Sequence, residues 1–375
     1  MRIVEVLPSF EVGGAERLVS LLSMELAKLG HAVAVVSLYN PVESWILREL
    51  RASGIEVLFC AKRAGLDVRV VPRLARIFAR LQPDIVHTHL HTLKYVVPAR
   101  LAFRHTAVAH TLHNLAQHEI EASGQAFQRA AFRLGVAPVA IGDAIARSVS
   151  EVYGLPAKAT IPNGIPVAAF QTPSGTRQRV RAVLAIPEDV PVFVAVGRLN
   201  PQKDHATLLA AFADPNISSL NAHLILAGAG DLRSALIGQA EALGISSRVH
   251  LLGVRDDISA LYAASDVFVL SSRYEGNPLV VMEAMASGLP IVATSVGSVP
   301  ELVPANVGRL VSPGNPESLA AAMRQLAGDL PLARSLGIYA AQYAVEHFDV
   351  AVMARGYATL FDTIRKPQRQ SGSTA

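Results

Sequence analysis

Two glutamates eight positions apart are the residues best suited to hold a ligand. Glu275 lies ahead of an apolar stretch and Glu283 lies inside it. Glu275 would sit just ahead of the cap of the expected helix, and Glu283 would lie about two turns along, roughly 8–9 Å beyond that cap by helix rise. The two carboxylates are then poorly placed to share one proton. This placement suits hydrogen bonds to hydroxyl groups at opposite ends of an extended ligand. Two surface acids are the alternative, but an unpaired acid is costly within an apolar helix.

The segment between these glutamates carries the signals of a helix start. We predict Asn277 as the N-cap, Pro278 as the first helical residue and Gly288 as the end of the helix. The free amides and positive dipole end of such a helix suit a phosphate group.

A second candidate is the loop containing Arg198 and Lys203, which follows an apolar run and Gly197. Arg offers a planar fork of donors and Lys a point charge, a combination that suits the oxygens of a diphosphate. Two ordinary loop cations are the alternative interpretation.

Histidines alternate at His87, His89 and His91, so in a strand all three rings would point to one side. A metal cluster is one interpretation of this pattern. The sequence offers no matching set of carboxylate ligands, however, and we expect no metal.

The elements that must position these residues alternate between strands and helices. In the first half, expected strands cover residues 2–7, 32–38, 56–59, 85–89 and 107–112, and expected helices cover 15–29, 45–53 and 71–81. Strands separated by helices of this length predict a parallel sheet with right-handed crossovers.

A second alternating set follows the polar stretch 171–177, which we interpret as a linker. Expected strands cover residues 192–196, 223–227, 249–252, 267–270, 291–293 and 308–311, and expected helices cover 206–212, 232–243, 258–264, 279–287 and 316–327. A final helix over 333–364 should break near His347. The predicted fold class is α/β, with two Rossmann-like parallel-sheet domains and a ligand site in the cleft between them.

Composition supports this architecture and excludes several classes. A chain of 375 residues exceeds twice the length of an average domain, and 51% hydrophobic residues suit large cores. The single cysteine, Cys60, excludes a disulfide framework and a multi-thiolate metal site. No apolar run is long enough for a spanning helix, and the early acid Glu5 argues against a signal peptide. We therefore expect a soluble cytoplasmic protein.

The net charge of +4 is too small to indicate nucleic-acid binding, but it is unevenly distributed. Residues 1–165 carry 18 Lys and Arg against 13 Asp and Glu, whereas the remainder carries 16 against 17. Arg73, Arg76 and Arg80 fall on one face of an expected helix, just after Arg69. They are a candidate for peripheral contact with an anionic membrane, and a solvated helix face is the alternative.

The motifs occur in a distinctive order along the chain. They are Gly13, Gly14, Ala15 and Glu16, then Arg198 and Lys203, Gly228, Ala229 and Gly230, Gly253, and finally Glu275 and Glu283 followed by residues 284–290. This order resembles the retaining, GT-B-fold glycosyltransferases of family 4 (glycosyl transferases group 1). The resemblance covers nearly the whole chain and is strongest over residues 192–303.

The resemblance implies a nucleotide-sugar donor bound mainly by the C-terminal domain, an acceptor bound mainly by the N-terminal domain, and no metal. Arg198 and Lys203 would hold the donor diphosphate and stabilise the departing charge. Glu275 would bind hydroxyls of the donor sugar, and Glu283 those of the ribose. The remaining donor-binding candidates are Gly276, Asn277, Pro278 and Leu279 at the helix start, Val254 in the loop 253–256 around the base, and Gly14.

The Gly13-Gly14 loop lacks the spaced third glycine of a dinucleotide fingerprint, so a tight turn is its simplest interpretation. In the family, the same loop approaches the phosphates or the acceptor. The family resemblance also implies that His113 contacts the donor sugar near the reacting carbon. His110 is the nearby competitor, and His89 and Glu16 are lesser candidates. No carboxylate is an obvious covalent nucleophile, which fits same-face attack assisted by the leaving phosphate.

Together these inferences predict a retaining glycosyltransferase that acts on a saccharide or lipid-linked acceptor, in polysaccharide or glycolipid biosynthesis. The expected domains are residues 1–168 and 169–345, with a helix over 346–365 that packs back on the first domain and a disordered tail over 366–375. Alternatives are a nucleotide-sugar epimerase or phosphorylase on the same fold, and a non-catalytic sugar-binding protein.

Overall fold

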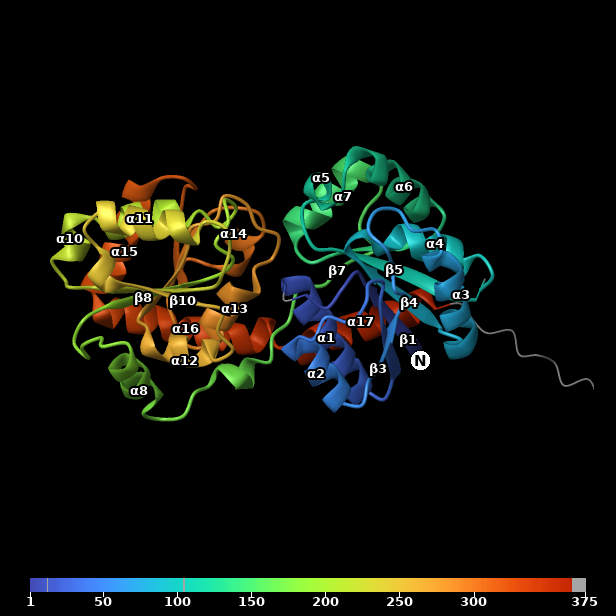
Figure 1. Ribbon diagram of the computed structural model, residues 1–375, viewed down its shortest axis with the longest axis horizontal. Coiled ribbons are helices and arrows are strands. Elements are labelled where there is room, and N and C mark those ends of the chain that lie inside the picture. Colours follow the sequence, from blue (N-terminus) through green and yellow to red (C-terminus); the bar gives the residue numbers. More distant parts are fainter. Residues whose placement is uncertain (12, 104, 366–375) are drawn as a thin grey trace, which may run out of the picture. The chain divides into compact units, whose positions relative to one another are not determined.

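The computed structural model describes residues 1–11, 13–103 and 105–365, and the chain forms two compact units. Unit 1 comprises Met1–Gly164 and Val350–Ala375, and unit 2 comprises Ile165–Asp349. Each unit contains one parallel sheet with helices on its two faces (Figure 1). The predicted α/β class with two Rossmann-like sheets is therefore confirmed. The predicted domains end after residues 168 and 345, whereas the chain passes from one unit to the other after residues 164 and 349. The predicted tail lies outside the described residues.

Unit 1 is built on a seven-stranded sheet in the order β3-β2-β1-β4-β5-β6-β7. Its strands are β1 (Arg2–Leu7), β2 (Ala32–Ser37), β3 (Glu56–Phe59), β4 (Ile85–His89), β5 (Ala107–Leu112), β6 (Ala137–Ala140) and β7 (Ala159–Thr160). All neighbouring pairs are parallel, so the carboxyl ends of β1, β4 and β5 meet at one edge of the sheet.

Two sets of helices cover the faces of this sheet. On one face α1 (Gly14–Lys28) contacts both α2 (Trp45–Ala52) and α17 (Val350–Ile364). The other face is covered by α3 (Val70–Leu81), α4 (Leu93–Arg100), α6 (Ala122–Arg133) and α7 (Asp143–Tyr153). Short turns η1 (Leu90–Thr92) and α5 (Ala116–Glu119) follow β4 and β5. Alternate residues of β1 and β2 divide between two separate hydrophobic cores, as a doubly covered sheet requires.

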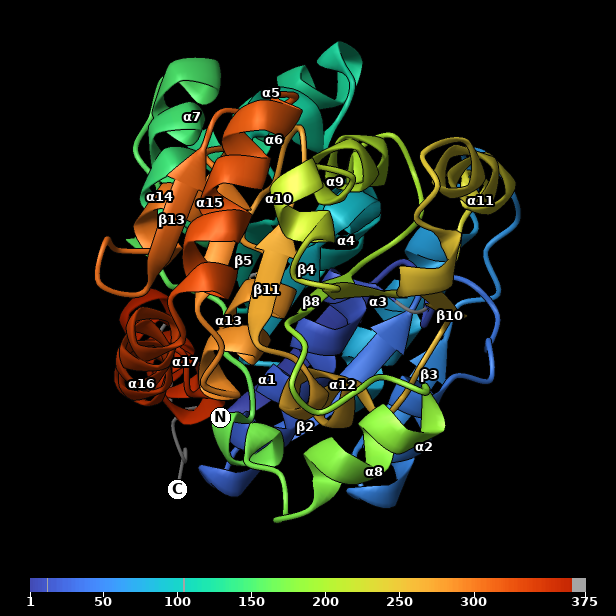
Figure 2. The same ribbon diagram turned by 90° about the vertical axis from the view of Figure 1, so that its left-hand side faces the viewer.

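Unit 2 contains a six-stranded parallel sheet in the order β10-β9-β8-β11-β12-β13, which can be followed from β13 to β10 in Figure 2. Its strands are β8 (Val192–Val196), β9 (His223–Ala227), β10 (Val249–Gly253), β11 (Val267–Leu270), β12 (Ile291–Thr294) and β13 (Gly308–Val311).

The helices of unit 2 also divide between two faces. The large core on one face includes α9 (His205–Phe212), α11 (Arg233–Ala242) and α15 (Pro316–Gly328). Elsewhere α8 (Thr176–Val183) packs on α12 (Ile258–Ala264), and α13 (Leu279–Ala286) packs on α16 (Leu330–His347). The remaining pieces are η2 (Val167–Phe170), α10 (Pro215–Ser218), η3 (Ser246–Arg248) and α14 (Val299–Leu302). Because α16 ends at His347 and α17 begins at Val350, the predicted break in the last helix is confirmed.

The polar stretch 171–177, which we interpreted as a linker, lies within unit 2. Arg177 donates a 2.7 Å hydrogen bond to Asp266, and the fully buried Arg181 donates one of 2.8 Å to the same carboxylate. These bonds fasten α8 to the segment before β11. Residues 171–175 are mostly exposed, so their polarity fits a surface segment, and the linker interpretation stays a prediction.

Within the described residues, no helix is both long and apolar enough to cross a membrane.

Candidate functional site

Lys203 and Glu275, which are 72 positions apart in the chain, form an ion pair at the carboxyl end of the unit 2 sheet. The Nζ atom of Lys203 lies 2.5 Å from Oε1 of Glu275. The loops after β8 and β11 carry these residues, and the two strands are neighbours in the sheet. Both side chains are largely buried, with 15% and 6% exposure. The sequence predicted both as site residues, and the fold brings them together.

Two serines missed by the sequence analysis complete this pair. Ser272 donates a 2.6 Å hydrogen bond to the same Oε1 atom of Glu275, and Ser271 donates one of 2.8 Å to the backbone carbonyl of Lys203. An anion that accepts from both an ammonium and a hydroxyl is held in one orientation. Serines in loops are too common to have been singled out from sequence.

Arg198 differs from Lys203 because its side chain is exposed. Within the part of the chain that the structure describes, no hydrogen bond or ion pair involves its guanidinium. Its loop is held by a 2.9 Å backbone hydrogen bond from Leu199 to Ala229. A fixed backbone with an uncommitted guanidinium can meet an anionic ligand without breaking a prior contact.

Two glycines explain how the loops around this pair approach each other. Gly228 has φ +146, and a Cβ atom there would lie 1.9 Å from the carbonyl oxygen of Gly197. Gly297 has φ +53, and a Cβ atom there would lie 1.8 Å from the carbonyl oxygen of Glu275. Only glycine fits either position. The motif containing Gly228 thus has a structural cause, and Gly297 is a support for Glu275 that sequence analysis missed.

The predicted N-cap of helix α13 needs a correction of one residue, from Asn277 to Pro278. Helix α13 begins at Leu279, with Pro278 as the N-cap in an extended conformation (ψ 111°). The carbonyl of Pro278 accepts the first helical hydrogen bond from Val281. Asn277 therefore lies outside the helix as a largely buried turn residue, and Gly276 accepts a hydrogen bond from Ser298. The predicted stop at Gly288 is confirmed, since α13 ends two residues earlier.

Glu283 lies in α13 and is half-buried, and the hydroxyl of Tyr262 donates a 3.3 Å hydrogen bond to it. Burial, reinforced by the negative charge of Glu283, raises the pKa of Tyr262 well above its usual value. Tyr262 thus remains a donor at neutral pH. Val254, in the loop after β10, is 71% exposed. Neighbouring Arg255 forms a two-pronged ion pair with Asp257.

In unit 1, Gly13 is the N-cap of α1 and Gly14 is its first residue. A Cβ atom on Gly13 would lie 2.4 Å from a carboxylate oxygen of Glu16, whereas one on Gly14 would meet nothing within 4 Å. Gly13 therefore lets Glu16 fold back over the start of α1, and the space beside Gly14 remains open.

His113 directly follows β5 and forms part of a buried polar cluster. Its Nε2 atom lies 2.9 Å from Nδ1 of His89, and Nε2 of His89 lies 2.8 Å from Oε2 of Glu5. Burial opposes ionisation of Glu5, but His87 and His89 outweigh it and lower its pKa to about 2. Burial lowers the pKa of His89 to about 4 and that of His113 well below its usual value. The cluster thus combines the carboxylate of Glu5 with the imidazoles of His89 and His113, which are neutral at pH 7.

The expectation that three histidines share one side of a strand was wrong for His91. Strand β4 ends at His89, and His91 lies in the turn η1. The rings of His87 and His89 do lie together, with centroids 4.1 Å apart. Glu5 supplies the carboxylate that the sequence analysis did not find.

Glu5, His87 and His89 could each offer one ligand atom to a metal ion. However, Oε2 of Glu5 lies 2.9 Å from His87 and 2.8 Å from His89, which are hydrogen-bond distances. The second nitrogen of His87 bonds to Thr111 at 2.7 Å. Oε1 of Glu5 and Nδ1 of His87 nevertheless make no hydrogen bond of acceptable geometry in the described structure, so the expectation of no metal stays a prediction.

His110, the competitor of His113, has a different environment. Its Nδ1 atom bonds to Thr88 at 2.8 Å, and its Nε2 atom bonds to Gln128 at 3.1 Å. Gln128 in turn accepts a hydrogen bond from Tyr153. Both ring nitrogens of this fully buried histidine are committed within the core, so His110 has a structural role.

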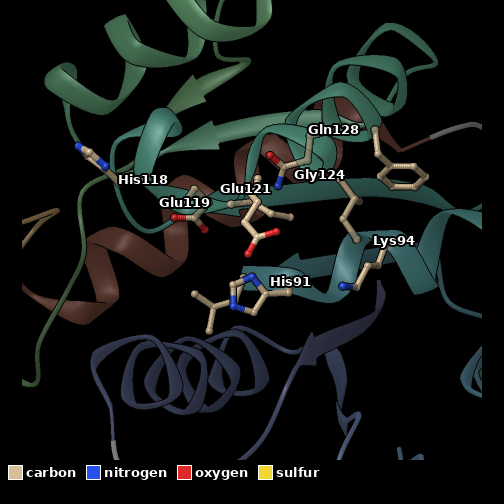
Figure 3. A pocket seen from close by; sticks show the side chains of 11 residues that line it. His91, Lys94, His118, Glu119, Glu121, Gly124 and Gln128 are labelled. Carbon is tan, nitrogen blue, oxygen red and sulfur yellow. The ribbon is translucent and has the colours of Figure 1, made fainter. Parts of the chain in front are cut away.

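A pocket of about 640 Å³ lies in unit 1, lined by segments that follow β4 and β5. Figure 3 shows polar side chains from both segments around it, among them His91, Glu121 and Gln128. Glu119 is 7% exposed, and its Oε1 atom has no hydrogen-bond partner. Burial raises the pKa of Glu119 to about 7, although backbone hydrogen bonds from His113 and Asn114 oppose the shift. The lining combines acids, an amide and one lysine with apolar side chains.

Two family models match the chain. The model "Glycosyltransferase Family 4" matches residues 12–169, and "Glycosyl transferases group 1" matches residues 176–343. An uncharacterized glycosyltransferase of Methanocaldococcus jannaschii is 33% identical over 48% of this chain and 48% of its own length. LpsE of Rhizobium meliloti, a lipopolysaccharide core biosynthesis glycosyltransferase, is 34% identical over 48% and 52%. The chain thus spans about half the length of these two relatives.

Among solved structures, Anabaena Alr3699/HepE in complex with UDP and glucose has a TM-score of 0.84 and 23% identity. The match covers 97% of this chain and all of that one, which establishes the fold over both units. Because the two family models together account for nearly all of residues 12–343, the chain belongs to the GT-B-fold glycosyltransferases of family 4 (glycosyl transferases group 1).

Proposed function

We propose that the protein transfers a sugar, with retention of anomeric configuration, from a nucleotide-diphosphate sugar to a saccharide or lipid-linked acceptor. The observation that carries this proposal is the oriented Lys203–Glu275 pair beside the uncommitted Arg198. Lys203 keeps N–H donors beyond the one directed at Glu275, so it can bind a phosphate oxygen while still holding the carboxylate.

On the donor side, Arg198 and Lys203 bind the diphosphate and stabilise the charge that develops on the leaving phosphate. Two cations then do the work that a metal ion does in other transferases, so the proposal is metal-independent. Glu275 binds hydroxyls of the transferred sugar, and Glu283 binds those of the ribose. The UDP and glucose found with HepE are consistent with a UDP-sugar donor.

On the acceptor side, we assign the pocket of unit 1 to the acceptor. Carboxylates and amides such as Glu119, Glu121 and Gln128 match sugar hydroxyls, while Phe127 offers an apolar face for a sugar ring. The name of LpsE supports an acceptor from cell-surface glycan synthesis.

The proposal of retention is supported by the contacts of Glu275, the carboxylate paired with Lys203. Oε1 of Glu275 already accepts from Lys203 and Ser272, which holds this carboxylate as a hydroxyl acceptor. In the proposed reaction, the acceptor oxygen attacks the face from which the phosphate leaves. The C–O bond to phosphate breaks, and the departing phosphate takes the acceptor proton.

The decisive experiment combines turnover with product analysis. UDP and GDP sugars are offered with and without oligosaccharide acceptors, and nucleotide release is measured in the presence of EDTA. Release that depends on the acceptor, with a product linkage of unchanged anomeric configuration in proton NMR, supports the proposal. An inverted linkage rejects retention, and an epimerised donor without transfer supports the epimerase alternative.

Lys203→Ala should reduce turnover at least about 100-fold, because it removes the positive charge that stabilises the negative charge on the leaving phosphate. Arg179→Ala is the matched control, since this exposed cation lies on α8 of the same unit. Full turnover in Lys203→Ala would contradict the assigned role. Binding of donor without turnover in any assay would favour the sugar-binding alternative.

We also propose a cytoplasmic or inner-face location, with peripheral membrane contact through α3. Three of the four arginines on and just before α3 have local partners. Arg69 pairs with Asp67, Arg80 pairs with Glu56, and Arg73 donates hydrogen bonds to backbone carbonyls. Arg76 is the exposed member without a recorded partner in the described structure. Salt-sensitive binding to anionic vesicles that Arg76→Glu abolishes would support this contact, and equal binding to neutral vesicles would remove it.

A further inference from the structure

A continuous line of polar groups crosses the middle of the unit 1 sheet. It begins at Glu5 in β1, passes through His89 at the end of β4, and reaches His113 after β5. Glu5 and His89 are completely buried, whereas His113 is partly exposed. A buried carboxylate in a central strand is costly unless its partners compensate it, so its retention needs an explanation.

The line of hydrogen bonds fixes where each proton lies. An ionised Glu5 can only accept, so the hydrogen of His89 is on Nε2, which faces Oε2 of Glu5 at 2.8 Å. A neutral His89 then presents a bare Nδ1, which accepts from Nε2 of His113 at 2.9 Å. The hydrogen of neutral His113 is therefore on Nε2, and its Nδ1 is bare.

The other nitrogen of His113 is available to a ligand. Within the described residues, no hydrogen bond is recorded at Nδ1 of His113. A bare imidazole nitrogen is an acceptor and cannot donate, so it selects a group that carries a hydrogen.

We propose that Glu5 and His89 are positioning residues, which hold His113 in the Nε2–H tautomer so that its Nδ1 atom accepts a hydrogen bond from a hydroxyl of the donor sugar. The inference rests on the proposed function, since it requires that a sugar lies beside His113. It assigns His113 the role of a neutral acceptor and excludes it as a cation or proton donor at pH 7. The low pKa values of His89 and His113 agree with this assignment.

A second branch of the same cluster supplies a control. Thr111 bonds to His87 at 2.7 Å and to the hydroxyl of Tyr357 in α17 at 2.9 Å. Thr111→Val removes these bonds but leaves the contacts from Glu5 through His89 to His113. If substitutions acted only by loosening the core, Thr111→Val would disturb His113 as much as a change at His89 does. If His89 positions His113 directly, only the change at His89 disturbs it.

The first test is histidine tautomer NMR on the full-length protein labelled with ¹⁵N-histidine, with His113 assigned by substitution. We expect His113 to carry its hydrogen on Nε2 between pH 6 and pH 8. His89→Phe removes its acceptor, so a mixture of tautomers should appear. Glu5→Gln should give a smaller change in the same direction, because an amide both donates and accepts. Thr111→Val should leave the tautomer unchanged.

The second test is kinetic. With the nucleotide sugar that turns over fastest, His89→Phe should lower kcat/KM roughly tenfold or more, and Thr111→Val should change it less than about twofold. The Nδ1 resonance of His113 should shift on addition of that nucleotide sugar but not of the nucleotide diphosphate alone.

The outcomes separate this inference from the function on which it rests. A His113 that carries its hydrogen on Nδ1, is protonated at pH 7, or keeps its tautomer in both variants overturns the relay. A silent Nδ1 resonance with an active donor overturns the sugar contact. Failure to turn over any nucleotide sugar counts against the proposed function, and the tautomer in the free protein still tests the relay.

Discussion

Mild acidification should destabilise this protein strongly, because several of its histidines are buried in neutral form. Burial lowers the pKa of His89 to about 4, that of His110 to about 3 and that of His205 to about 4. In the unfolded chain these imidazoles take up a proton below about pH 6.5, whereas in the folded protein they do not. The unfolded state therefore binds more protons between pH 6.5 and pH 4, and the free energy of unfolding falls as pH falls through this window.

The size of the effect follows from the width of the window. At pH 5 the solution is roughly 1.5 pH units below the unfolded-state pKa of each histidine. At about 1.4 kcal/mol per unit, each histidine then lowers the free energy of unfolding by about 2 kcal/mol. Three such groups give about 6 kcal/mol. Glu119 acts in the opposite sense, because its raised pKa of about 7 makes the folded state take up a proton first. Acidification from pH 7.5 to pH 5 recovers about 2 kcal/mol there, so these four groups together give a net loss of about 4 kcal/mol. His113, whose pKa burial also lowers, adds to this loss. Glu5, with its pKa near 2, changes little in this range.

Urea unfolding at pH 7.5, 6.5, 5.5 and 5 measures this loss, with a separate probe for each unit because their transitions need not coincide. A net loss of about 4 kcal/mol is a large part of the 5–15 kcal/mol that stabilises most proteins. His110→Gln should reduce the difference between pH 7.5 and pH 5 by about 2 kcal/mol, whereas exposed His347→Gln should not change it. Stability that stays constant from pH 6.5 to pH 5, in the wild type and in Glu119→Gln, would refute the argument.

Three further outcomes test other parts of the structure. Ser272→Ala removes one of the two hydrogen bonds on Oε1 of Glu275. Steady-state kinetics should therefore give a kcat/KM for the donor about tenfold lower, with little change in melting temperature. An unchanged kcat/KM would contradict the role of Ser272. Gly297→Ala places a Cβ atom 1.8 Å from the carbonyl oxygen of Glu275, so the free energy of unfolding should fall by more than about 2 kcal/mol. Gly244 has φ +68 but lies in open space, so the control Gly244→Ala should lower it by only about 1 kcal/mol. Arg181→Leu removes a fully buried guanidinium that donates five hydrogen bonds. Thermal unfolding should therefore show a free energy of unfolding lower by about 3–5 kcal/mol. A decrease of less than about 1 kcal/mol would rule out a stabilising role for Arg181.

Periodicity was sufficient where an element is long or strongly apolar. The strand expected at 107–112 coincides with β5, and the helix expected at 15–29 differs from α1 by one residue at each end. The short strands β6 and β7 were not predicted, because four or two residues carry too little pattern to stand out. The expected range 279–287 begins where α13 begins, but the N-cap was assigned one residue too early. Asn277 and Pro278 are both good helix-start residues, and sequence alone does not rank them.

The site was predictable in its residue types but not in its pairings. Lys203 and Glu275 were each identified from local context, yet their contact depends on two strand ends that meet only in the folded sheet. Glu5 was noticed only as an early acid in the chain. Its signal was a lone carboxylate inside an otherwise apolar strand, which indicates a partner on the same face of the sheet. That partner, His89, is 84 positions away.

The division of the chain into units has a consequence for synthesis on the ribosome. Unit 2 is one continuous segment, but unit 1 is completed by α17, which begins only at Val350. At roughly 5–20 residues per second, translation of the intervening segment takes about 10–40 s. During that interval the nascent first 164 residues lack Tyr357 and Phe361, whose rings cover His87. Unit 2 can therefore finish folding before unit 1, whose last helix is synthesised after it.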